Sequence, residues 1–234
     1  MAVTEAWLWV YVAAMAAGAL LFIVWSRDRQ QVPRAEYLVA MAIPLWSGLW
    51  YAVMALGGGQ TEIAGETTYW ARYVDWVVTT PLLLIALAFT GTQALARKPW
   101  RIVGLLIGAD VVMILSGLLA DLSTAQWLRY GLYALGVVAL IVVYSLIWGP
   151  LRAAAERQPA PMARTYREVA ALLSILWLGY PLIWILGPSG LGLFGDVTDT
   201  ALFVLLPILS KVGWSIVDLS RLRSLGRRGE LTVA

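Results

Sequence analysis

The sequence contains no cysteine and no histidine, and charged residues make up only 13% of its 234 positions. Without these side chains the chain cannot form a disulfide, a zinc site of the usual ligands or a histidine general base. An ordinary soluble domain carries about 25% charged residues. The composition therefore excludes those sites and argues against a soluble domain.

Apolar residues are abundant instead, at 61% of the chain. They form seven runs long enough to cross a bilayer as helices, which takes about 20 residues each. Backbone polar groups find no water inside lipid, so each run is expected to be helical. The expected spans are residues 5–25, 35–56, 70–93, 101–119, 125–149, 167–186 and 198–220.

The segments between these runs alternate in charge. Residues 27–34, 96–101, 150–167 and the tail after Arg221 are basic, and the other loops carry aspartate and glutamate. The positive-inside rule therefore predicts an extracellular N-terminus and a cytoplasmic C-terminus. We expect an all-α seven-helix domain over residues 1–224 of a multi-pass cell-membrane protein, with a short basic cytoplasmic tail at 225–234. The loops account for the positive charge, so nucleic acid is not an expected partner.

Ionisable residues inside the runs are candidate functional residues, because a charge in a membrane is costly. A desolvated lysine such as Lys211 can condense with an aldehyde to form a Schiff base, although a structural ion pair fits its depth equally well. Asp75 in the third run would serve as its counter-ion, with Thr79 one turn further on the same face. Arg72 is placed to stabilise the Asp75 carboxylate, or else the two only rigidify the bundle.

Aromatic residues add a second pattern. In WLGYPLIW (177–184) the spacings of three, four and seven residues place Trp177, Tyr180 and Trp184 on one helix face. Such a stripe is usually plain packing unless a ligand is indicated independently. With Trp76 from the third run, it would suit a long conjugated ligand in an apolar pocket.

The segments RYVDWVVTTPLLL (72–84), WLGYPLIW and SKVGW (210–214) together resemble the microbial rhodopsins, and the resemblance covers nearly the whole chain. The resemblance implies that the protein is a membrane pigment and not an enzyme, and that it holds no metal ion. It also implies all-trans retinal bound to Lys211 as a protonated Schiff base, isomerisation to 13-cis in light, and Asp75 as counter-ion. Asp110 matches a buried carboxyl position near the retinal ring. The matching retinal-binding positions are Tyr51, Trp76, Thr80, Met113, Gly117, Trp177, Tyr180, Trp184, Pro207 and Ser210, with Trp50 beside Tyr51.

The chain departs from the outward proton pumps of that family at two positions. Where those pumps have a cytoplasmic carboxylic acid and a second aspartate, this chain has Ala86 and Pro207. Asp75 argues against a chloride pump, and the sodium-pump pattern is absent. Pro207, SKVGW and Asp218, with LVAMAIPLWSGL (38–49) and GYPLIWILGPSG (179–190), resemble the xenorhodopsin branch, which includes Anabaena sensory rhodopsin.

The resemblance to this branch implies a light-driven inward proton pump. Asp218 lies seven residues after Lys211, about 10 Å nearer the cytoplasm along a helix. It would accept the Schiff-base proton, with Glu36 assisting, and reprotonation from outside would pass near Arg72 and Asp75.

Three alternatives stay open. Asp218 would be an ordinary interfacial residue if it paired with Arg221 or Arg223. The protein would be a photochromic sensor if its light reaction were read by a soluble transducer. A seven-helix protein without pigment would make Lys211 incidental. Relatives form rings, often trimers, so a homo-oligomer in the lipid bilayer is expected.

Overall fold

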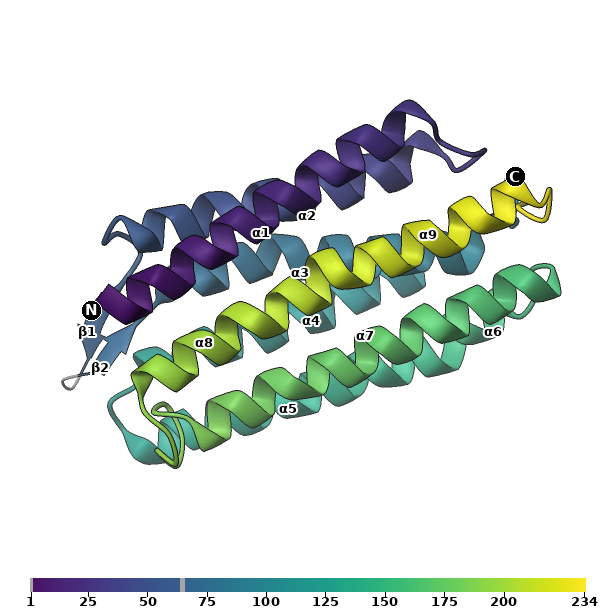
Figure 1. Cartoon of the computed structure of the whole chain (residues 1–234). Coiled ribbons are helices and arrows are strands. Elements are labelled where there is room, and N and C mark those ends of the chain that lie inside the picture. Colours follow the sequence, from purple (N-terminus) through teal and green to yellow (C-terminus); the bar gives the residue numbers. More distant parts are fainter. Residues whose placement is uncertain (1, 64–65) are drawn as a thin grey trace.

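A computed structural model describes residues 2–63 and 66–234 as a bundle of long helices lying side by side (Figure 1). Within these residues, seven helical segments are long and apolar enough to cross a membrane, which confirms the expected seven-helix bundle of a multi-pass membrane protein. The first four spans are α1 (Ala2–Arg27), α2 (Arg34–Ala55), α3 (Trp70–Thr92) and α4 (Trp100–Leu122).

Two of the last three spans contain π-helical turns and are therefore built from shorter pieces. Pro150 lies within the first such turn and Pro207 directly before the second; a proline removes one backbone donor and so disturbs the regular ladder. The fifth span is α5 (Gln126–Leu146), η1 (Ile147–Leu151) and α6 (Arg152–Ala155); the sixth is α7 (Ala160–Leu186); the seventh is α8 (Asp196–Pro207), η2 (Ile208–Gly213) and α9 (Trp214–Arg227).

The helices extend further than the apolar runs predict, and one short sheet was not expected. Segment 150–167, expected as a loop, is mostly helical, and α9 continues seven residues past 220 to Arg227. Hydropathy marks only the part of a helix that lies in hydrocarbon, whereas the helix itself continues into the polar zone. Between α2 and α3, β1 (Thr61–Ile63) pairs antiparallel with β2 (Glu66–Thr68).

The spans form a closed ring. Successive helices contact one another from α1 to α5, and α8 and η2 pack against α1, while α3 also contacts α7 across the interior. The N-terminus and the hairpin lie at one end of the bundle and the C-terminus at the other (Figure 1). These are called the N-terminal end and the C-terminal end below.

Polar and apolar side chains are distributed as in a membrane protein. Leu20, Leu45 and Leu105 are more than half exposed on the outer surface, where lipid would contact them. Asp75, Asp110 and Lys211 are at most 1% exposed. Ionisable groups thus face the interior, where they can bind one another and do chemistry.

Candidate functional site

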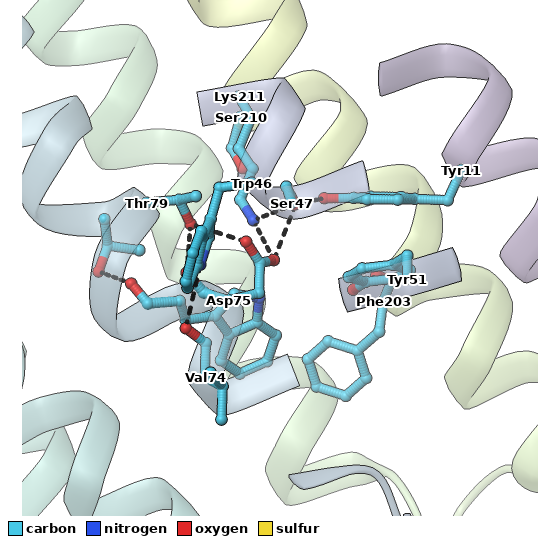
Figure 2. A network of polar contacts seen from close by, with 12 residues as sticks. Tyr11, Trp46, Ser47, Tyr51, Val74, Asp75, Thr79, Phe203, Ser210 and Lys211 are labelled. Atoms are coloured by element: carbon cyan, nitrogen blue, oxygen red, sulfur yellow. Dashed lines mark hydrogen bonds and ion pairs between the residues drawn. The ribbon is translucent and has the colours of Figure 1, made fainter. Parts of the chain in front are cut away.

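Lys211, in the π-helical turn η2, contacts Asp75 of α3 at the centre of the bundle (Figure 2). The Nζ of Lys211 forms an ion pair with Oδ2 of Asp75 and donates a hydrogen bond of 2.9 Å to Oγ of Ser47 on α2. Ser47 in turn donates to the same carboxylate oxygen at 2.8 Å. Both charges are buried, so either one alone would be costly and the pair compensates them.

Tyr11 of α1 completes this network. Its hydroxyl lies 2.6 Å from Oγ of Ser47. A serine hydroxyl has one hydrogen, which is directed to Asp75, so Ser47 accepts from both Lys211 and Tyr11. Sequence reasoning missed Ser47 and Tyr11. The four-residue spacing between Ser47 and Tyr51, which places both on one face of α2, would have indicated Ser47.

Thr79 lies one turn beyond Asp75, as its spacing requires. Its Oγ1 lies 2.9 Å from the carbonyl oxygen of Asp75 and 3.2 Å from Oδ1 of the same residue. Oδ2 faces Lys211 and Ser47, so both carboxylate oxygens face donors. The negative charge of Asp75 is therefore held by groups from three spans.

Arg72 pairs with a different partner from the one expected. Its Nη1 lies 3.3 Å from Oδ2 of Asp199 in the first turn of α8, and its guanidinium lies 4.8 Å from the ring centres of both Tyr69 and Phe203. The expected partner was Asp75. Side chains lean toward the N-terminus of their helix, so Arg72 extends away from Asp75 toward the N-terminal end of the bundle.

A polar cavity opens at that end. Arg72 and Asp199 line it together with four further acids from the helix ends and the hairpin, Glu5, Glu62, Asp121 and Asp196. This vestibule connects the N-terminal end of the bundle with the region around Arg72. Water that enters it can approach Arg72 from that end of the bundle.

An apolar pocket lies beside the Lys211–Asp75 pair. Its empty volume is about 730 Å³, including its open side, which is within the range of roughly 300–1,000 Å³ for small-molecule sites. Sequence reasoning missed Phe203 of α8 and Tyr133 and Gly136 of α5, which also line it. The expected ligand positions that line it are Trp76, Thr80, Met113, Gly117, Trp177, Tyr180 and Trp184.

The other expected ligand positions support the wall from behind. The hydroxyls of Ser210 and Tyr180 lie 2.7 Å apart. Tyr51 stacks on Tyr11 with ring centres 3.6 Å apart, and its hydroxyl donates to the carbonyl of Phe203 at 2.9 Å. Pro207, four residues after Phe203, has no N–H to offer that carbonyl, so Tyr51 replaces the missing helical donor.

These features fit a long apolar aldehyde. Trp76 lines the pocket and directly follows Asp75, so the pocket begins next to the amine of Lys211. The Nζ of Lys211 is the atom that would become the Schiff-base nitrogen, and Asp75 would balance its charge. Asp110, which accepts a hydrogen bond of 2.6 Å from Thr80, lies behind the pocket wall.

Comparison with known proteins decides the family, because residues 2–225 match the family described as bacteriorhodopsin-like protein. The chain belongs to this family of microbial rhodopsins. It is 34% identical to sensory rhodopsin-2 of Natronomonas pharaonis over 212 residues, which are 90% of this chain and 86% of that protein. The family binds retinal through a lysine Schiff base, and Lys211 is the lysine at the centre of this bundle.

Solved rhodopsin structures share the fold. The thermophilic rhodopsin from Rubrobacter xylanophilus superposes with a TM-score of 0.91 at 34% identity, covering 97% of this chain and 100% of that one. The light-driven proton pump from Coccomyxa subellipsoidea superposes with a TM-score of 0.85 at 28% identity, covering 93% and 96%.

In this rhodopsin a second buried network lies toward the C-terminal end. Asp218 of α9 is 2% exposed and accepts a hydrogen bond of 2.8 Å from Thr90 of α3. The arginines considered as its partners bind other acids: Arg221 pairs with Glu168 at 3.1 Å and Arg223 with Asp28 at 3.8 Å. Asp218 is therefore an interior residue and not part of an interfacial ion pair.

Glu36 belongs to the same end of the interior. It is buried and accepts a hydrogen bond of 2.5 Å from Gln93. Lys98 donates to the carbonyl of Gln93 at 2.9 Å, and burial lowers the pKa of the Lys98 amine. The backbone N–H of Ala234 also donates to this carbonyl at 3.1 Å, so the last residues of the chain fold back over Gln93.

An apolar layer separates the two networks. Ala86 lies in α3 between Asp75 and Thr90, and Trp214 lies between Lys211 and Asp218. Both are buried in one hydrophobic cluster with Ile43 of α2. A proton that moves from Lys211 to Asp218 must therefore pass this mainly apolar cluster.

Proposed function

We propose that this rhodopsin is a light-driven inward proton pump of the xenorhodopsin type, with all-trans retinal bound to Lys211 as a protonated Schiff base. The single observation that carries the proposal is the buried Asp218, held by Thr90 on the C-terminal side of Lys211. When bound, retinal supplies the light-driven isomerisation. The protein supplies Asp218 as a proton acceptor on the C-terminal side of Lys211. At position 86 it has an alanine, which cannot donate a proton.

The charge of the two ends supports the membrane orientation on which the proposed direction depends. Arg27, Arg97, Lys98, Arg157 and Arg228 lie in or near the turns at the C-terminal end. Basic residues favour the cytoplasmic side of a membrane, which supports a cytoplasmic C-terminal end and an extracellular N-terminal end. In that orientation Asp218 lies inward of Lys211.

Asp75 and Asp218 then have different tasks. Asp75 balances the positive charge at Lys211, and its oxygens are already occupied by Ser47 and Thr79. Asp218 takes up the proton that leaves Lys211 toward the cytoplasm. Because the layer around Ala86 and Trp214 is apolar, the transfer requires water to enter that layer transiently.

Glu36 and the vestibule complete the path. Glu36 and its partner Gln93 lie between Asp218 and the C-terminal end, so Glu36 assists release. The proton that restores Lys211 comes from the vestibule beside Arg72 and Asp199. With Pro207 in place of a second aspartate, Asp75 is the one counter-ion that we assign to Lys211.

Light-induced pH changes test the proposal. Cells that express the protein with added retinal should alkalinise unbuffered medium on illumination, and a protonophore should abolish the change. Lys211→Ala should abolish the pigment. Asp218→Asn should retain the pigment and lose inward pumping, whereas Asp28→Asn, which removes an exposed carboxylate at the same end, should pump normally. Acidification by the wild-type protein would contradict the direction, and unchanged pumping by Asp218→Asn would contradict the acceptor.

A photosensor is the second candidate function. The similarity to sensory rhodopsin-2 supports it, and the basic C-terminal end offers a surface for an acidic soluble transducer. A pigment that completes its photocycle without changing the external pH would favour this candidate over a pump. In either case we propose a homo-oligomer, a trimer by resemblance to relatives, which cross-linking in membranes would reveal.

A further inference from the structure

Asp121, the penultimate residue of α4, bonds to two aromatic residues of the pocket wall. Its Oδ2 accepts a hydrogen bond of 2.5 Å from the hydroxyl of Tyr73, and its Oδ1 accepts one of 2.7 Å from Nε1 of Trp184. Tyr73 and Trp184 are both buried and both line the apolar pocket. Short hydrogen bonds to a carboxylate are among the stronger ones in proteins, so Asp121 fixes both rings.

The two rings are also fixed by packing. Trp184 stacks on Tyr133 of α5, with ring centres 4.7 Å apart and planes at 14°. Tyr73 lies so close to α4 that a Cβ at Gly117 would be 3.1 Å from its ring. Each ring thus has a packing partner on one side, while Asp121 holds its polar edge. Loss of Asp121 would leave two buried donors without that acceptor.

Asp121 lies at the end of the pocket remote from Lys211. The amine of Lys211 contacts α2 and α3, whereas Asp121 is one turn beyond Gly117 on α4 and is joined through Trp184 to Tyr133 on α5. It also lines the polar vestibule. One carboxylate therefore stands between the vestibule and the far end of the pocket.

A charge at that place affects colour. Light absorption by a protonated Schiff base moves positive charge from the nitrogen along the conjugated chain toward its far end. A carboxylate near the far end stabilises the excited state more than the ground state, because Coulomb attraction falls with distance. The carboxylate of Asp75 beside the nitrogen has the opposite effect.

We propose that Asp121 is a positioning residue that fixes Tyr73 and Trp184 at the far end of the pocket, and that its carboxylate there sets the absorption maximum. The inference rests on the pigment formed at Lys211, which is part of the proposed function, and not on the direction of pumping. It therefore applies equally to a pump and to a sensor.

The test uses the full chain with retinal. Asp121→Asn keeps the size of the side chain but removes its charge, and an amide oxygen replaces one of the two acceptors. We expect absorption at shorter wavelength and dark bleaching by hydroxylamine that is faster by roughly tenfold, as loss of one charge-assisted hydrogen bond implies. Asp196→Asn removes an exposed carboxylate from the same vestibule and should change neither quantity.

Two further variants separate positioning from a general loss of packing. Tyr73→Phe removes one donor but keeps the ring, and should also speed bleaching. The double variant with both Tyr73→Phe and Asp121→Asn should bleach no faster than Asp121→Asn alone, because both changes remove the same hydrogen bond. Asp121→Glu retains the charge, so its absorption maximum should lie close to that of the wild-type pigment.

The outcomes are distinguishable. An unchanged spectrum in Asp121→Asn, a shift to longer wavelength, or an equal shift in Asp196→Asn would overturn the inference alone. If the wild-type chain formed no pigment with retinal, the proposed function and this inference would both fall.

Discussion

The hydroxyl of Tyr51 donates a hydrogen bond of 2.9 Å to the carbonyl of Phe203, across 152 positions of sequence. The acceptor is the carbonyl that Pro207 cannot serve, because proline has no N–H. Tyr51 on α2 thus supplies the hydrogen-bond donor that α8 lacks about one turn before η2. The proline near Lys211 is accommodated by a neighbouring helix, as is common for prolines in membrane spans.

Tyr51→Phe should destabilise the protein by about 1–3 kcal/mol, because the Phe203 carbonyl would stay buried without a partner. The temperature at which the pigment bleaches measures this loss. Tyr144→Phe is the matched control, since Tyr144 donates to the carbonyl of Ser174 at 2.7 Å. Ser174 lies inside α7, where its carbonyl keeps a helical donor, so the control should lose less. Equal losses in the two variants would contradict the role given to Tyr51.

Ser47→Ala and Asp75→Asn should shift the absorption maximum in opposite directions. Asp75→Asn removes the negative charge beside the nitrogen of Lys211, which should move absorption to longer wavelength. Ser47→Ala removes a donor from Oδ2 of Asp75 and leaves its charge more available to Lys211, which should move absorption to shorter wavelength. Spectra of the two purified pigments decide this, and shifts of the same sign would count against the arrangement.

Thr90→Val should slow proton transfer to Asp218, and Thr90→Ser should not. Thr90 donates to Asp218 and so stabilises the carboxylate, the form that can accept a proton. We expect the transfer to slow by roughly tenfold, as loss of one hydrogen bond implies. Flash photolysis with a pH-indicating dye measures the rate. Thr92→Val is the control, because Thr92 donates to the carbonyl of Ala88 and not to Asp218. Equal transfer rates in Thr90→Val and Thr92→Val would contradict the role given to Thr90.

The fold and the centre of the site could be predicted because both follow from strong physical costs. Seven long apolar runs have few alternatives to spanning helices in a membrane. Lys211 and Asp75 are charged residues in two such runs, and a buried charge requires a partner. The aromatic residues in WLGYPLIW could be assigned to one wall because helical spacing alone places them on one face.

The rest depends on contacts that no local pattern specifies. The partner of Arg72 is Asp199, which is 127 positions away, and side-chain direction rather than spacing selects it. Ser47 and Tyr11 bond to the centre through hydroxyl groups, which are common in apolar runs and have no charge to mark them. The hairpin of β1 and β2 lies in a short polar segment without an apolar alternation to predict it.

The closure of the ring between α1 and the last span has a consequence for biosynthesis. The chain is made from its N-terminus, so α1 to α7 exist before Lys211 leaves the ribosome. Until then Asp75 lacks the Lys211 cation that balances it in the complete bundle. When the last span arrives, Lys211 pairs with Asp75, the helix packs beside α1, and the attachment point for retinal is in place. Retinal can therefore be loaded only after the last span has joined the bundle, which makes colour a reporter of that assembly step.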